Sequence, residues 1–210
     1  MKSTFYKYLI LTILFFLLTE ITKHILNFDK LVYNSLAEKL TSNQIKNLFD
    51  FQDKWKWLGY VFIPIYILLK TSIIATVLYI GVFFFSKKEV KFKLVWEIVV
   101  KSEFVFLLVP VFKILWFCFV ETNYKLNDFQ YFYPLSALNI IGYTGLETWF
   151  IYPFQTLNLF ELVYWLLLAF YLGKATETNM DKGFKIVVFS YGPALLLWIV
   201  LVMFLTLNNS

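Results

Sequence analysis

The feature that most constrains this chain is an apolar run from Trp57 to Phe85 that carries a single charged residue, Lys70. A helix needs about 20 mostly apolar residues to cross a lipid bilayer. Backbone polar groups inside a bilayer must be hydrogen-bonded within the protein, and a helix satisfies all of them by itself. The run therefore predicts a transmembrane helix, and four similar runs elsewhere in the chain extend the prediction to a polytopic membrane protein.

Composition supports the same fold class. The chain of 210 residues is 60% hydrophobic and 22% aromatic, whereas a soluble domain averages about 45–50% apolar residues. The apolar runs lack the period-two alternation that marks the strands of a membrane β-barrel. We therefore expect an all-α bundle of transmembrane helices, with residues 1–210 forming one integral membrane domain.

Five transmembrane helices are predicted, at residues 6–26, 64–85, 104–120, 154–172 and 186–206. The first is the least apolar of the five, because its second half carries Glu20, Lys23 and His24. The chain's start resembles a signal peptide, but no small-residue cleavage site follows the apolar stretch. The segment is therefore interpreted as an uncleaved first helix.

Three connecting segments are expected to lie at the membrane surface. Residues 27–56 place apolar residues at helical spacing and predict an outer loop of amphipathic helices. Residues 91–101, KFKLVWEIVVK, predict an interfacial helix. Residues 121–153 form an outer loop rich in aromatic residues, and its apolar part, PLSALNIIGYTGL, is too short to span. A re-entrant or interface-lying segment is expected there.

The distribution of lysines predicts that the N-terminus is inside, in a bacterial inner membrane. Cytoplasmic loops carry an excess of basic residues, and after the second helix only Lys125 falls in an outer segment. The lysines of the loop 27–56 oppose this orientation, and nearby acids offset them only weakly. The lysines expected inside are Lys2, Lys7, Lys87, Lys88, Lys91, Lys93, Lys101, Lys174, Lys182 and Lys185.

From Pro64 onward the order of segments resembles a known family. A helix ending GVFFFSKK leads into KFKLVWEIVVKSEFVFLLVPVFKILWF, and TLNLFELVYWLLLAFYLGK and KGFKIVVFSYGPALLLWIVLV follow. This order is similar to the Yip-type membrane domain, a family of small polytopic proteins first known as partners of Rab GTPases. The resemblance covers about residues 64–205 and implies about five spanning helices without established catalytic residues. It implies no trafficking role, because the cytoplasmic N-terminal region of the eukaryotic members has no counterpart here.

Lys70 is predicted to be a bystander. Counting back about 20 residues from Lys87 places Lys70 only a few residues below the outer surface of the membrane. The aliphatic stem of a lysine can carry its ammonium group from that depth to water. We therefore expect no partner for Lys70 inside the bundle.

Lys113 and Glu161 are predicted to form an intramembrane ion pair. Each lies about 12 Å below the expected outer boundary by helix rise, and a lysine near mid-membrane needs a partner or a water-filled cavity. Asn158 lies one turn above Glu161 on the same helical face. Two interpretations stay open, a structural pair that fixes helix register and a substrate or proton site.

Several function classes are disfavoured by composition. The single cysteine, Cys118, and single histidine, His24, cannot form a disulfide or a His/Cys metal cluster. All 19 basic residues are lysine, and the absence of arginine argues against nucleic-acid binding and phosphoryl transfer. We expect no enzymatic activity and no cofactor.

Two functions therefore compete. The first is a non-enzymatic membrane subunit or scaffold of a transport, secretion or envelope-assembly complex, with the two outer loops as docking surfaces. The alternative is a small oligomeric transporter or channel with Lys113 and Glu161 lining its path. Membrane lipid and either other membrane subunits or further copies of the chain are the expected partners. Polar residues of several helices converging on a hydrated cavity would favour the alternative.

Overall fold

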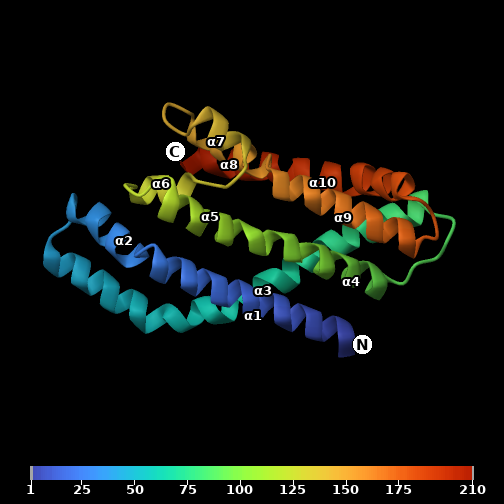
Figure 1. Ribbon diagram of the computed structural model, residues 1–210, viewed down its shortest axis with the longest axis horizontal. Helices are drawn as coiled ribbons and strands as arrows, with labels where there is room; N and C mark the ends of the chain where they lie inside the picture. The colour runs from blue at the N-terminus through green and yellow to red at the C-terminus, as the bar shows by residue number, and fades with distance from the viewer. Residues whose placement is uncertain (1, 210) are drawn as a thin grey trace.

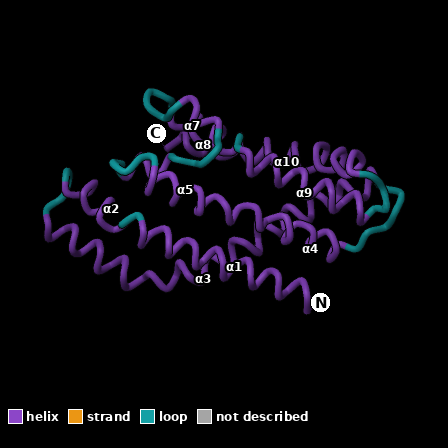
Figure 2. Tube along the Cα trace, viewed as in Figure 1, coloured by secondary structure: helices purple, strands orange, loops and turns teal. Residues whose placement is uncertain are grey.

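The computed structural model describes residues 2–209, and every regular element among them is a helix (Figure 2). In chain order the elements are α1 (Lys2–Ile25), α2 (Phe28–Ala37), α3 (Ser42–Phe85), α4 (Phe92–Glu103), the 3-10 helix η1 (Phe104–Leu107), α5 (Leu108–Phe119), α6 (Leu126–Tyr131), α7 (Ala137–Ile141), α8 (Thr148–Thr156), α9 (Leu159–Ala175) and α10 (Met180–Asn209). The all-α prediction is confirmed for this part of the chain.

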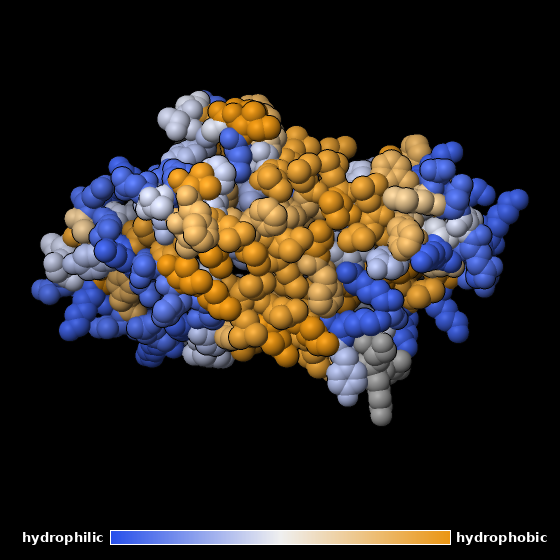
Figure 3. All heavy atoms as spheres, viewed as in Figure 1, coloured by the Kyte–Doolittle hydropathy of each residue, from blue (hydrophilic) through white to orange (hydrophobic). Residues whose placement is uncertain are grey.

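The long helices run along the longest axis of the molecule (Figure 1). One end of the bundle, here called the N-terminal end, carries the N-terminus and the loops at residues 86–91 and 176–179. The opposite end, the C-terminal end, carries α2, α6, α7 and the C-terminus. In this view the surface is hydrophobic in the middle and hydrophilic at both ends (Figure 3). Such a belt is the surface that a bilayer requires of a spanning protein.

Three helices are long and apolar enough to cross a membrane. They are Thr4–Ile25 in α1, Ser42–Phe85 in α3 and Met180–Asn208 in α10. The predicted spans at 6–26, 64–85 and 186–206 lie almost entirely within them. At three of the five predicted positions the structure therefore contains helices whose length and composition would allow them to cross a membrane.

The predicted spans at 104–120 and 154–172 fall on helices that are interrupted. Pro110 has no backbone N–H, and its ring crowds the carbonyl of the preceding turn. That preceding turn is the 3-10 helix η1, which lies directly before α5. The second interruption falls at Leu157 and Asn158, where α8 ends and a new helix cap begins α9.

Helix α3 is longer than predicted, because the expected surface helix and the second span are one continuous element of 44 residues. It begins at a capping box, in which the Thr41 backbone N–H donates to Oε1 of Gln44 at 2.9 Å. The helix continues from there to its C-cap at Ser86. Pro64 lies inside the helix, and its carbonyl accepts a 2.7 Å hydrogen bond from the hydroxyl of Tyr8 in α1.

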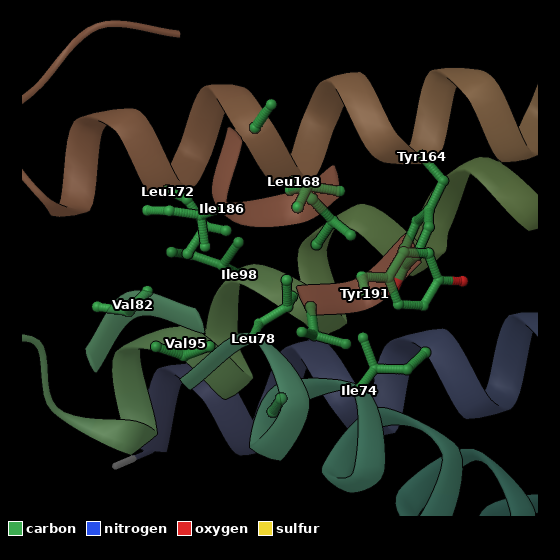
Figure 4. Packing of buried hydrophobic residues seen from close by; sticks show 14 of the residues in the cluster. Ile74, Leu78, Val82, Val95, Ile98, Tyr164, Leu168, Leu172, Ile186 and Tyr191 are labelled. Atoms are coloured by element: carbon green, nitrogen blue, oxygen red, sulfur yellow. The ribbon is translucent and has the colours of Figure 1, made fainter. Parts of the chain in front are cut away.

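Helix α4 corrects the prediction of an interfacial helix at residues 91–101. Val95 and Val99 are completely buried, and Ile98 is nearly so. They pack against Leu78 of α3 and Leu168 and Leu172 of α9 in the main hydrophobic cluster (Figure 4). The amphipathic pattern was read correctly as a helix, but its apolar face contacts protein rather than lipid.

A close backbone contact joins α9 to α10. A Cβ atom placed on Gly183 would lie 2.0 Å from the backbone oxygen of Ala169 and 2.8 Å from the nitrogen of Gly173. Only a residue without a side chain fits at this approach. The two helices are thereby held together near the loop at residues 176–179.

A charged cluster ties α1 to α4 near the N-terminal end. The Glu97 carboxylate accepts hydrogen bonds from Lys7 at 2.7 Å and from Thr4 at 3.0 Å, and pairs with Lys101 at 3.0 Å. These groups stabilise the charged form of the carboxylate.

Aromatic rings pack against one another at the C-terminal end of the bundle. Phe117 of α5 lies 4.4 Å from the ring of Tyr124 and 5.1 Å from the ring of Phe132, measured between centroids. Beyond them the five-residue helix α7 leaves Ile140 88% exposed. That exposure suits the segment predicted to be re-entrant or interface-lying, whose relation to lipid stays a prediction.

Candidate functional site

A cavity of about 910 Å³ opens between the helices of the bundle and is bounded by α1, α3, α4, η1, α5 and the helices from α8 to α10. Its volume falls in the range of small-molecule sites. Most of its wall is apolar or aromatic. The polar side chains that reach it include Lys70, Glu103, Gln155, Asn158, Glu161 and Tyr191.

Three ionisable residues from three helices meet at similar depth in this cavity. All three residues lie roughly 17 to 23 Å from the N-terminal end of the bundle, at 1.5 Å of helix rise per residue. The count runs from Phe85 to Lys70 in α3, from Phe92 to Glu103 in α4, and from Ala175 to Glu161 in α9. A bilayer core is about 30 Å thick. The cavity is therefore well inside the apolar belt rather than at either polar end.

Lys70 forms an ion pair with Glu103, with 2.8 Å between Nζ and Oε2. The same ammonium lies 4.4 Å from the centre of the Phe106 ring. The prediction that Lys70 is a bystander is thus wrong, because the side chain points into the bundle instead of toward the surface. Its partner belongs to the helix that was expected at the interface, so depth counting on α3 alone could not find it.

Glu103 is only partly satisfied by this pair. The residue is 2% exposed, and its second oxygen, Oε1, has no hydrogen-bond partner among the described residues. The hydroxyl of Tyr164, also fully buried, likewise has none. Tyr164 and Tyr191 lie side by side at one end of the core cluster, with ring centroids 5.8 Å apart (Figure 4).

Glu161 is oriented by contacts on two helices. Its Oε1 atom accepts hydrogen bonds from the indole N–H of Trp165 at 2.9 Å and from the hydroxyl of Tyr191 at 2.8 Å. Its backbone N–H donates to Oδ1 of Asn158 at 2.8 Å. The carboxylate is therefore at the first turn of α9, where the helix dipole favours a negative charge.

Asn158 holds the break between α8 and α9. Its Oδ1 caps α9, and its amide nitrogen donates to the carbonyls of Gln155 at 2.9 Å and Thr156 at 3.0 Å. These bonds satisfy backbone groups that the interruption leaves free. Asn158, which was predicted as part of a site, thus forms hydrogen bonds that stabilise the backbone, although it also lines the cavity.

The structure does not bring Lys113 and Glu161 together as the predicted pair. The Lys113 ammonium lies 4.0 Å from the centre of the Phe129 ring, toward the C-terminal end. No ion pair is formed by either residue in the part of the chain that the structure describes. Equal depth does not bring two side chains together, because the rotation of each helix about its axis also decides which neighbour a side chain faces.

Glu103 and Tyr191 were missed from the sequence. Glu103 falls just before the predicted span at 104–120, so it was placed outside the lipid. Taking residues 92–119 as one helical segment would have put this acid near its middle, opposite Lys70. Tyr191 carries no comparable signal, because tyrosines are common throughout this chain.

No three His, Cys, Asp or Glu side chains within residues 2–209 are close enough together to hold a metal ion.

No family model, curated protein or solved structure matches the chain. The Yip-type resemblance stays a prediction.

Proposed function

We propose that this protein is an integral membrane carrier whose substrate site is the cavity between α3, α4 and the helices α8 to α10. The observation that carries the proposal is the meeting of Lys70, Glu103 and Glu161 at one cavity inside the apolar belt. Ionisable side chains are expensive in a membrane and typically mark a substrate or ion pathway. A purely structural subunit has no need of a cavity of about 910 Å³ at that place.

The two interrupted helices support the same proposal. The α8–α9 break places Asn158 and Glu161 on the cavity wall, and η1 follows directly after Glu103. Membrane carriers often build their sites from discontinuous helices, since irregular backbone is tolerated at membrane depth only where protein or a cavity satisfies it.

The proposal includes five membrane crossings with the N-terminus inside, in a bacterial inner membrane. In chain order, α1 and α3 are the first two crossings and α10 is the fifth. The third crossing consists of α4, η1 and α5, which follow one another along the bundle axis. The fourth crossing is α8 with α9. Five passes are also what the Yip-type resemblance implies. Five helices seldom form a complete pathway alone, so the proposal includes self-association. It includes no enzymatic activity.

A second candidate is a scaffold or subunit of a larger membrane complex. The observation that favours it is the exposed apolar side chains on α3 before the predicted span. Leu48, Phe51 and Trp55 are 41%, 62% and 42% exposed. Under this alternative that surface docks another chain, and the cavity has no ligand.

Cysteine accessibility distinguishes the two candidates. In a Cys118→Ser background reconstituted into lipid, an Ala194→Cys variant places a thiol on the cavity wall. We expect it to react with methyl methanethiosulfonate, a small neutral reagent, because a carrier's site is reached by water. The matched control is Val99→Cys, a near-isosteric change at a fully buried core position, which should not react.

If the Ala194→Cys thiol reacts as slowly as the Val99→Cys thiol, the cavity is closed to water and the carrier proposal fails. The scaffold candidate would then be favoured. Unchanged melting temperatures of both variants would show that the comparison concerns folded protein.

A further inference from the structure

We infer that the cavity binds an amphipathic organic cation, with the carboxylate of Glu161 as the counter-charge for its ammonium or phosphonium group. This inference rests on the proposed function and names its substrate class. It is carried by the charge balance of the cavity, the orientation of Glu161 and the aromatic character of the walls.

The charges that line the cavity are unequal. Two carboxylates, Glu103 and Glu161, share the site with one ammonium, that of Lys70. Lys70 is already paired with Glu103 at 2.8 Å. Glu161 has no cationic side chain within ion-pair distance among residues 2–209. An uncompensated carboxylate in an apolar surrounding is unfavourable, so a bound cation would complete the site.

The Glu161 carboxylate is held in a defined orientation. Trp165 and Tyr191 both donate to Oε1, whereas Oε2 makes no hydrogen bond in the described chain. Oε2 is also not among the buried atoms that lack a partner. One oxygen is therefore anchored and the other is accessible at the cavity, as expected of a preorganised acceptor.

The aromatic walls suit a cation. Ring faces attract ammonium groups within about 6 Å of their centroids, and Phe106 already makes this contact with Lys70 at 4.4 Å. The other rings on the wall include Tyr66, Tyr133, Tyr152 and Trp198. The remaining apolar lining would accommodate hydrophobic substituents.

An anionic ligand fits this cavity poorly. The one lysine is engaged by Glu103, and an added negative charge would face both carboxylates. A ligand with a delocalised or shielded positive charge and an apolar body matches both the charge and the walls. That chemistry separates a cation site from a lipid-phosphate or fatty-acid site.

The test compares two probes of nearly equal shape and opposite charge. Tetraphenylphosphonium and tetraphenylborate are each added to the Ala194→Cys protein, and the rate of modification by methyl methanethiosulfonate is measured. We expect the phosphonium to slow the reaction saturably and the borate to leave it unchanged. Glu161→Gln should raise the half-protecting phosphonium concentration about tenfold or more, the scale of a lost buried ion pair. Glu147→Gln, the same change at an exposed position outside the cavity, should have no effect.

Equal protection by both probes, or protection by phosphonium that survives Glu161→Gln, would overturn the cation inference. The thiol would still react without a probe in that case, so the carrier proposal would stand. A thiol that never reacts would instead contradict the carrier proposal itself. If Glu161→Gln fails to fold, the comparison of the two probes on the otherwise unchanged cavity decides the inference alone.

Discussion

Lys70 and Lys113 are two lysines on apolar helices, and the protein accommodates them in different ways. Lys70 has a carboxylate partner in the bundle, at 2.8 Å from Oε2 of Glu103. Lys113 lies over the ring of Phe129 at 4.0 Å from its centre. The first arrangement compensates a full charge, whereas the second supplies only the weaker attraction of a ring quadrupole.

Lys70→Met should destabilise the protein by about 3 kcal/mol, because the Glu103 carboxylate is left buried without its partner. Glu103→Gln should cost less, because the Lys70 side chain is 32% exposed. We expect Lys70→Met with Glu103→Gln to cost much less than the two single changes combined. Chemical unfolding in detergent measures all three variants, with the exposed Lys56→Met as control. Strictly additive effects would show that the two residues do not interact.

Lys113 should be coupled to Phe129 and not to Glu161. A double-mutant cycle of Lys113→Met with Phe129→Leu is expected to give an interaction energy of about 0.5–2 kcal/mol. The cycle of Lys113→Met with Glu161→Gln should be additive within about 0.5 kcal/mol. A large coupling energy in the second cycle would restore the ion pair predicted from the sequence.

Pairs of elements are held by features that involve few residues. The α9–α10 contact depends on the missing side chain of Gly183, because an added Cβ would overlap the backbone of Ala169 at 2.0 Å. The α1–α4 contact depends on Glu97, which receives hydrogen bonds from two residues of α1. Either contact can be tested without touching the cavity.

Gly183→Ala should separate α9 from α10 and lower the melting temperature strongly. Gly59→Ala is the matched control, since no atom lies within 4 Å of a Cβ built at Gly59 in α3. Alanine is favoured over glycine in a helix by about 1 kcal/mol, so the control should be neutral or stabilising. A Gly183→Ala protein as stable as the wild type would show that the close approach is not required.

Glu97→Gln should weaken the α1–α4 contact. The change removes the negative charge that Lys7 contacts at 2.7 Å and Lys101 at 3.0 Å. The variant should therefore melt at a lower temperature than the wild type in detergent. An unchanged melting temperature would contradict this assignment.

On the face shown in Figure 3, the middle of the molecule is apolar and both ends are hydrophilic. The loops at 86–91 and 176–179 share the N-terminal end, where Lys88 forms an ion pair with Glu177 at 2.5 Å. The start of α3 and helix α6 lie at the other end. Positions 91 and 177 are therefore expected on one side of the membrane, and positions 46 and 128 on the other.

Single cysteines in a Cys118→Ser background should report that sidedness. Lys46→Cys and Asp128→Cys are expected to react with an impermeant maleimide added outside the cell. Lys91→Cys and Glu177→Cys should react only after the membrane is permeabilised. Outside labelling at position 91 would overturn the N-inside orientation, and outside labelling at only one of positions 46 and 128 would contradict the five crossings.

The fold class and the positions of the three long apolar helices could be predicted from local composition. Apolar runs such as Trp57–Phe85 depend on local composition, and the requirement to satisfy backbone groups in lipid leaves a helix as the solution. The break before α9 was also encoded locally, because Asn158 followed by Glu161 three residues later is a capping pattern.

Which charges meet could not be predicted from local sequence, because it depends on the packing of distant helices. Pairing Lys70 with Glu103, and placing Glu161 against Tyr191, depends on how α3, α4, α9 and α10 are rotated about their axes. Helical periodicity specifies which residues of one helix share a face, but it does not specify which neighbouring helix that face meets. Packing contacts between distant segments, such as the backbone approach at Gly183, select that rotation. The cavity exists only once those rotations are set.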